Sequence, residues 1–181
     1  MSLGVDYAKQ DCPLARALEL VGERWTLLIL RDAFYGVRRF TDFAGHLDIS
    51  KAVLTQRLSS LVRAGLLTKV PCGGRDEYLL TDSARMLWPA LYTLSQWGEQ
   101  QTGQGSPRRI FLHVDCGSKV DAVGHCATCR YAPGPEELEI HPGPGADFGV
   151  RDDPVSRALR YPHRLLQPLD TRAQSERMPE R

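Results

Sequence analysis

Residues 50–65 read SKAVLTQRLSSLVRAG, and this stretch decides the fold. Ser50 is a good N-cap because its side-chain oxygen can accept a free backbone N–H of the first turn. Gly65 is a good stop because glycine accepts the left-handed backbone that often ends a helix. The spacing therefore predicts a helix that runs from Ser50 to about Ala64.

The two sides of this predicted helix have opposite chemistry. At 100° per residue, three leucines fall within about 60° of one another and must face a core; they are Leu54, Leu58 and Leu61. The remaining surface carries small polar, amide and cationic groups: Ser50, Lys51, Ala52, Thr55, Gln56, Arg57, Ser59 and Arg63. No acidic residue interrupts it. Such a surface suits duplex DNA, because glutamine can pair with adenine, and arginine or lysine with guanine or phosphate.

The neighbouring elements complete the order of a winged helix-turn-helix. The expected elements are helices over residues 12–22, 25–34 and 40–47, strands over 66–70 and 77–80, and a last helix over 81–102. Pro89 predicts a kink in the last helix or a second helix that starts there. The chain is thus predicted to be mainly α-helical with a small β-hairpin, and residues 50–64 are predicted to enter the major groove.

Three further arginines are expected to hold the flanking DNA backbone: Arg75 at the hairpin tip, and Arg38 and Arg39 before the third helix. The formal net charge of +1 gives no overall basic field, so the prediction of DNA binding is local. A winged helix that binds another protein is therefore the alternative. Loss of nucleic-acid binding with rising salt separates the two, because phosphate contacts release counterions.

Composition excludes several other classes. The 181 residues are 42% hydrophobic and 25% charged, as in a globular protein, and contain no apolar run that could span a bilayer. The first residues lack the features of a secretory signal, so a cytoplasmic protein is expected. In a reducing compartment the five cysteines are better interpreted as thiols or metal ligands than as a disulfide framework.

The periodic pattern breaks at residues 103–107, where glycine, serine and proline gather, and this segment is the predicted linker. It separates a DNA-binding and dimerisation domain over residues 8–102 from a small Cys/His-containing extension over residues 108–145. Residues 146–181 are expected to form an irregular or partly disordered tail.

The last predicted helix carries an apolar surface that is broader than one small domain needs to cover. The residues expected in a symmetric dimer contact are Leu87, Leu91, Leu94 and Trp97. Tight packing within a single chain is the alternative. Near the other end of this domain, Cys12 precedes a proline at a helix start, where backbone amides favour a reactive thiolate, and it is a candidate sensor.

Several separate motifs, in this order, resemble the HxlR family of regulators. They are Cys12-Pro13, GERWTLLIL (22–30), Arg38-Arg39-Phe40, ISKAVLTQRL (49–58), Gly65-Leu66, YLLT (78–81) and Trp97-Gly98. The resemblance implies a homodimeric winged-helix regulator, often a repressor of a neighbouring gene, whose terminal helices form the dimer contact. Some members of the family have a redox switch at the position of Cys12. The wing departs from the family pattern, because Gly73-Gly74 occupies the bend.

Two close pairs of ligand-type residues stand in the extension: His113-x-x-Cys116 and Cys126-x-x-Cys129. Such pairs suit one tetrahedral zinc ion, and four protein ligands would make the ion structural. Arg130 stands where glycine often completes such a turn, and reduced thiols on a small hairpin are the alternative. An enzyme is disfavoured, because no nucleophile motif or phosphate loop lies near these ligands.

Overall fold

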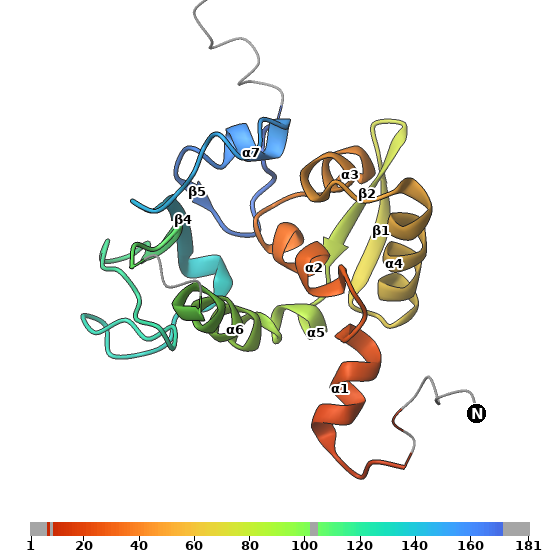
Figure 1. Ribbon diagram of the computed structural model, residues 1–181, viewed down its shortest axis with the longest axis horizontal. Coiled ribbons are helices and arrows are strands. Elements are labelled where there is room, and N and C mark those ends of the chain that lie inside the picture. The colour runs from red at the N-terminus through yellow and green to blue at the C-terminus, as the bar shows by residue number, and fades with distance from the viewer. Residues whose placement is uncertain (1–6, 8, 102–104, 172–181) are drawn as a thin grey trace, which may run out of the picture.

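The computed structural model describes residues 7, 9–101 and 105–171, and its first part has the predicted winged helix-turn-helix order (Figure 1). The elements are α1 (Pro13–Val21), α2 (Thr26–Phe34), α3 (Phe40–Leu47), α4 (Lys51–Arg63), β1 (Leu67–Cys72) and β2 (Arg75–Leu80). Among the described residues, no helix is long and apolar enough to cross a membrane.

The ends of α4 follow the chemistry expected from the sequence. At its start the Ser50 hydroxyl accepts a hydrogen bond from the Val53 N–H at 3.4 Å. At its end Gly65 has a φ of +69°, and the Leu66 N–H donates to the Leu61 carbonyl at 3.0 Å. This left-handed turn satisfies a helix carbonyl and sends the chain into β1.

Two boundaries differ from the sequence prediction. The second helix begins at Thr26, because Trp25 has a left-handed backbone with a φ of +77°. The wing strands extend to a two-residue turn at Gly73 and Gly74, whose φ values of +55° and +77° suit a tight hairpin. The wing is therefore longer and its bend tighter than expected.

The predicted last helix is divided in two. α5 (Asp82–Arg85) is capped by the Thr81 hydroxyl, and α6 (Trp88–Gln101) has Pro89 as its second residue. Proline is tolerated there because the first-turn N–H groups have no partner within the helix. The division at Pro89 is confirmed, and Thr102 lies outside the described residues.

The extension, defined from here on as residues 105–171, includes the predicted Cys/His extension and the described part of the predicted tail. It contains more regular structure than its sequence suggests. Its elements are β3 (Arg109–His113), a 3₁₀ turn η1 (Pro135–Glu137), β4 (Leu138–Pro142), α7 (Pro154–Ala158) and β5 (His163–Arg164). The strands form an antiparallel sheet in the order β3-β4-β5. α7 and β5 lie within the range expected to be irregular. They are ordered because Val155, Leu159 and Leu165 are buried; residues 172–181 lie outside the described residues.

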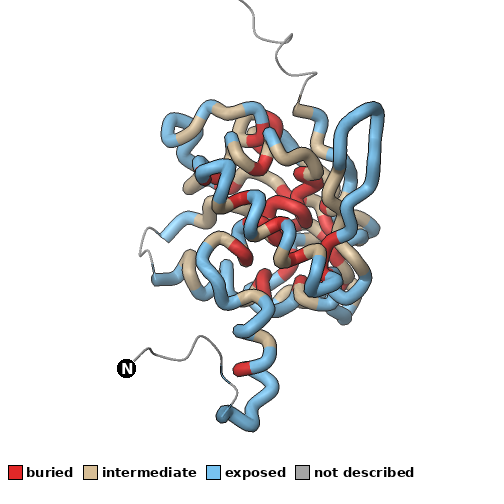
Figure 2. The backbone as a smooth tube through the Cα atoms, turned by 90° about the vertical axis from the view of Figure 1, so that its right-hand side faces the viewer, coloured by how far each residue is buried: buried red, intermediate tan, exposed pale blue. Residues whose placement is uncertain are grey.

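One continuous hydrophobic core runs through both parts of the chain, and Figure 2 shows the buried backbone concentrated at the centre. Phe111 of β3 joins the parts. Its ring lies 5.6 Å from that of Trp88 and 5.3 Å from that of Tyr92, and Trp88 in turn lies 5.0 Å from Phe34 of α2. The extension therefore packs directly on the helices of the helix-turn-helix unit.

The C-terminal strap (residues 165–171) binds the loop between α2 and α3. The Leu166 N–H donates to the Phe34 carbonyl at 2.8 Å, and the Leu169 N–H donates to the Gly36 carbonyl at 3.0 Å. Gly36 has a φ of +90°, and a Cβ at this position would lie 1.8 Å from the Gln167 carbonyl oxygen. Only glycine fits this close approach.

Gly36→Ala should destabilise the fold. Backbone strain alone costs on the order of 1–3 kcal/mol at such a φ, and the contact with Gln167 adds to it. Gly45→Ala is the matched control, because Gly45 lies within α3 and a Cβ there meets nothing within 4 Å. This control should be neutral or stabilising, and urea unfolding of the two variants measures both effects. Equal stability of the two would contradict the close approach.

Candidate nucleic-acid interface and metal centre

The structure orients α4 as the sequence predicts. Leu54, Leu58 and Leu61 are buried in the core. The exposed residues on the other side are Ser50, Lys51, Ala52, Thr55, Gln56, Ser59 and Arg63. Within this set, the Thr55 hydroxyl donates to the Lys51 carbonyl and the Arg63 guanidinium donates to the Ser60 hydroxyl. Gln56 lies between them along the helix, and α4 itself contains no carboxylate.

The turn before α4 is rigidly built. Asp48 closes α3 with a left-handed φ of +52°, and Ile49 is buried beneath the turn. Aspartate adopts this backbone more readily than most residues, because its short side chain can bond locally. The angle between α3 and α4 is thus set by an apolar contact and by one backbone conformation.

Arg57 does not join the exposed face. Its guanidinium lies 2.9 Å from the Glu23 carboxylate, and its side chain is only 18% exposed. Glu23 belongs to the turn between α1 and α2, so this ion pair connects α4 to that turn. In this structure the Arg57 guanidinium is engaged by Glu23, and its role as a DNA contact stays a prediction.

Arg38 and Arg39 form the base of the wing. The Tyr78 N–H donates to the Arg38 carbonyl at 2.8 Å, and Arg39 pairs with Glu77 as an isolated antiparallel bridge. The Arg39 guanidinium lies 3.5 Å from Glu77, and the Arg38 guanidinium donates to the Leu166 carbonyl at 3.0 Å. Both cations are half-buried and partly neutralised, which makes them structural as well as candidate phosphate contacts.

Arg75 lies exposed at the tip of the wing, next to the glycine turn. A second cation of the hairpin, Lys69, lies 2.7 Å from Asp76. A shallow hollow between the wing and α3 combines cations, aromatic rings and one carboxylate; it is lined by Arg39, Phe40, Thr41, Arg75, Asp76 and Tyr78.

The predicted dimer residues fall into two groups. Leu91 is buried in the chain's own core and Leu87 is partly buried, whereas Leu94 and Trp97 of α6 are exposed. Leu91 belongs to the same buried cluster as Phe34 and Trp88. Leu91 is therefore a packing residue of the single chain.

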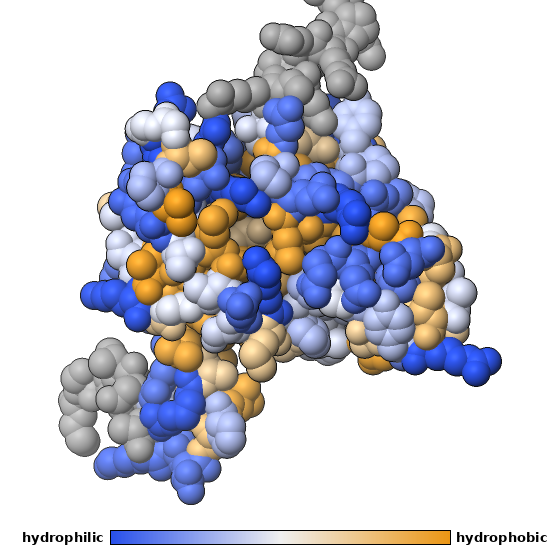
Figure 3. Space-filling model, turned by 180° about the vertical axis from the view of Figure 1, so that it is seen from behind, coloured by the Kyte–Doolittle hydropathy of each residue, from blue (hydrophilic) through white to orange (hydrophobic). Residues whose placement is uncertain are grey.

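α1 projects from the body (Figures 1 and 2). Its Leu14 and Leu18, one turn apart, are both exposed. Figure 3 shows hydrophobic as well as hydrophilic side chains on this projecting lobe. Cys12 is the N-cap residue of α1 and is exposed, and its sensing role stays a prediction.

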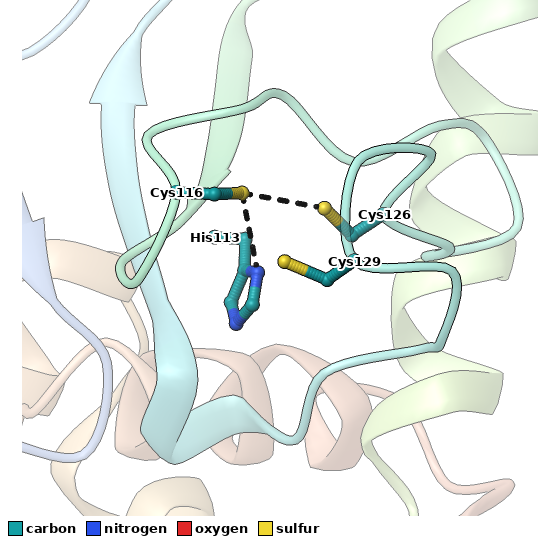
Figure 4. A group of neighbouring side chains, drawn as sticks. All are labelled: His113, Cys116, Cys126 and Cys129. Atoms are coloured by element: carbon teal, nitrogen blue, oxygen red, sulfur yellow. Dashed lines mark hydrogen bonds between the residues drawn. The ribbon is translucent and has the colours of Figure 1, made fainter.

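The four predicted metal ligands lie together (Figure 4). Their ligand atoms are all within 4.8 Å of one another, and they are His113, Cys116, Cys126 and Cys129. The Cys116 Sγ lies 3.4 Å from His113 Nδ1 and 3.5 Å from Cys126 Sγ. Tetrahedral zinc with ordinary bond lengths separates its ligand atoms by about 3.4–3.8 Å, so the cluster has the size of one such site.

The first ligand pair is carried by a tight turn after β3. The His113 N–H donates to the Ser118 carbonyl at 2.9 Å, and the Gly117 N–H donates back to the His113 carbonyl at 2.8 Å. Gly117 has a φ of +68°. Hydrogen bonds to Ser118 lower the pKa of the Cys116 thiol to about 6, which favours its thiolate form.

The second pair repeats the same turn. The Cys126 N–H donates to the Tyr131 carbonyl at 2.8 Å, and the Arg130 N–H donates back to the Cys126 carbonyl at 2.7 Å. Arg130 has a φ of +62°, so it adopts the backbone that glycine has in the first turn. The absence of glycine at Arg130 therefore does not prevent the turn.

Sequence reasoning missed two residues beside this cluster. The Tyr131 hydroxyl lies 3.0 Å from His113 Nε2 and donates to Glu137 Oε1 at 2.6 Å. Neither residue has the spacing of a metal ligand, and Glu137 comes close only because the Val114 N–H donates to its carbonyl. No sequence signal pointed to them.

Fold and site together define a winged helix-turn-helix protein with a Cys/His cluster in its extension. The family model described as HxlR-like helix-turn-helix matches residues 20–106. An HTH-type transcriptional regulator of Mycobacterium tuberculosis, Rv3095, is 43% identical over 137 residues, which cover 73% of this chain and 86% of the relative. The chain belongs to the HxlR-like helix-turn-helix family, which confirms the resemblance in its motifs.

Two other matches agree. The regulator YdeP of Bacillus subtilis is 32% identical over 107 residues, which cover 54% of this chain and 82% of YdeP. The crystal structure of PA1607, a candidate transcription factor, superposes with a TM-score of 0.59 at 36% identity, over 68% of this chain and 89% of that one. The family and these relatives are transcriptional regulators and not enzymes, as expected for this chain.

Proposed function

We propose that the protein is a sequence-specific DNA-binding repressor that acts as a homodimer on a palindromic operator and carries one structural zinc ion. The observation that carries DNA binding is the exposed face of α4, which holds amide, hydroxyl and cationic groups and has no carboxylate between Ser50 and Gly65. The repressor role rests on the family resemblance.

Different residues are assigned to base contacts and to phosphate contacts. Gln56 at the centre of the exposed face is assigned to a base edge, because its amide can both donate to and accept from adenine. Lys51, Arg63 and Arg75 are assigned to phosphates on either side, where they fix the register of the helix in the groove. Arg57 is left out because Glu23 neutralises it.

A homodimer is supported by apolar side chains that this chain leaves uncovered. Leu14 of α1 is 65% exposed and Trp97 of α6 is 58% exposed. Burying such side chains stabilises an association by about 1.5–3 kcal/mol each. A second copy, related by a two-fold axis, would cover both helices and present two copies of α4 to adjacent turns of the duplex.

Zinc is supported by the geometry and chemistry of the cluster. Three thiols and one imidazole are the ligands that tetrahedral zinc prefers, and with all four supplied by the protein no position remains for water. Because Cys126 belongs to the shared core and His113 is buried, the ion would stabilise the whole chain and not only the extension.

Gln56→Ala should relax the base preference at one position of each half-site, at a cost of about 1–3 kcal/mol. Arg63→Ala should weaken binding to all sequences alike and reduce the dependence on salt concentration. Fluorescence anisotropy with a selected operator and its single-base variants measures both effects. Gln100→Ala, an exposed glutamine of α6, is the control and should bind as wild type. An unchanged base preference in Gln56→Ala would contradict the assignment of Gln56 to a base edge.

Leu14→Glu and Trp97→Glu should each convert the dimer to a folded monomer of 20.2 kDa, because a carboxylate would be buried without a partner in the dimer but not in the single chain. Light scattering at micromolar concentration gives the mass, and circular dichroism gives the fold. Val150→Glu, at an exposed apolar residue of the extension, should stay dimeric. A wild-type mass of one chain would refute the dimer.

Protein purified without chelator should contain about one zinc per chain, and removing the zinc should lower its unfolding temperature. The double variant Cys126→Ser, Cys129→Ser should lose the metal, whereas Cys72→Ser on the exposed wing should keep it. Metal analysis and thermal unfolding test this. A metal-free wild-type protein of unchanged stability would show that the cysteines are ordinary thiols.

A further inference from the structure

The imidazole of His113 is wholly buried, and its two nitrogens face different groups. Nδ1 points to the thiol cluster and lies 3.4 Å from Cys116 Sγ (Figure 4). Nε2 lies 3.0 Å from the Tyr131 hydroxyl, and it lies 3.9 Å from a carboxylate oxygen of both Asp115 and Glu137. The protonated nitrogen therefore decides which side of the ring can bind a metal.

The hydrogen bonds around Tyr131 decide where that proton lies. An ionised carboxylate only accepts hydrogen bonds, so the Tyr131 hydroxyl must use its one proton toward Glu137, at 2.6 Å. The phenol oxygen can then only accept from His113. Nε2 consequently carries the hydrogen, and the lone pair of Nδ1 is left facing the three thiols.

We propose that Tyr131 and Glu137 are positioning residues that hold His113 as an Nδ1 ligand of the metal. This inference rests on the proposed zinc centre. It also assigns the ion to the thiol side of the ring: the other candidate group, His113 with Asp115 and Glu137, would need the nitrogen that carries the proton. Partners of this kind orient a ligand ring and raise its basicity.

The local structure holds Tyr131 and Glu137 in place. The turn that carries Cys126 and Cys129 holds Tyr131, because the Cys126 N–H donates to the Tyr131 carbonyl. The Tyr131 ring meets the His113 ring edge to face, with centroids 5.3 Å apart. Glu137 is held by its second oxygen, Oε2, which accepts the Gly134 N–H at 2.8 Å. Backbone groups of Cys126 and Gly134 therefore hold the two residues whose side chains bond to His113 and to each other.

Tyr131→Phe keeps the ring and removes only the hydroxyl, so we expect a 10–100-fold loss of zinc affinity in a folded protein. Competition with a chromophoric chelator measures the affinity. Tyr161→Phe, at an exposed tyrosine of the same extension, is the control and should bind zinc as wild type. Glu137→Gln leaves one acceptor oxygen for two donors, the Tyr131 hydroxyl and the Gly134 N–H. This variant should also weaken zinc binding.

Nitrogen-15 NMR of the zinc-loaded wild-type protein tests the tautomer without any variant. A protonated Nε2 and a metal-bound Nδ1 on His113 are expected; a metal-bound Nε2 overturns the proposal even if Tyr131→Phe fails to fold. Wild-type affinity in Tyr131→Phe would also overturn it. A wild-type protein that takes up no zinc would instead refute the metal centre itself, so the two failures are distinguishable.

Discussion

The contact on which the rest of the structure depends is that of Phe111 with the rings of Trp88 and Tyr92. Aromatic rings bury large apolar areas and favour edge-to-face geometry, which fixes orientation as well as distance. This contact places β3 against α6, and through Trp88 it reaches Phe34 of α2. The extension and the helix-turn-helix unit consequently share one hydrophobic core, so each part covers apolar residues of the other.

The metal cluster lies on the same strand as this contact. Phe111 and His113 are two residues apart in β3, so both point to its buried face. Strand β4 continues the sheet, and the Leu165 N–H donates to the Leu138 carbonyl, which leads into the C-terminal strap on the loop between α2 and α3. A continuous set of contacts therefore runs from the cluster through the sheet and the strap to the loop between α2 and α3.

The charge of α4 differs from the charge of the chain as a whole. The chain is nearly neutral overall, yet α4 itself contains no carboxylate. Two acids near its flanks are engaged, since Glu23 pairs with Arg57 and Glu77 lies against Arg39, whereas Asp48 in the turn before α4 is exposed. The two ion pairs leave the attraction of the exposed face for an anion nearly unchanged, because Lys51 remains exposed and is in none of the ion pairs among the described residues.

The sequence by itself determined the local elements of the helix-turn-helix unit and the family, because caps, glycine stops and the spacing of leucines in residues 50–65 depend on neighbours close along the chain. It also determined the two ligand pairs, since each pair is closed by its own short turn, but the meeting of the two pairs is a tertiary contact. Only the tertiary structure decided that Arg57 faces Glu23, that Leu91 enters the core and that Tyr131 and Glu137 meet His113. These contacts join residues from different elements, and a pattern along the chain carries no information about which elements will pack against each other.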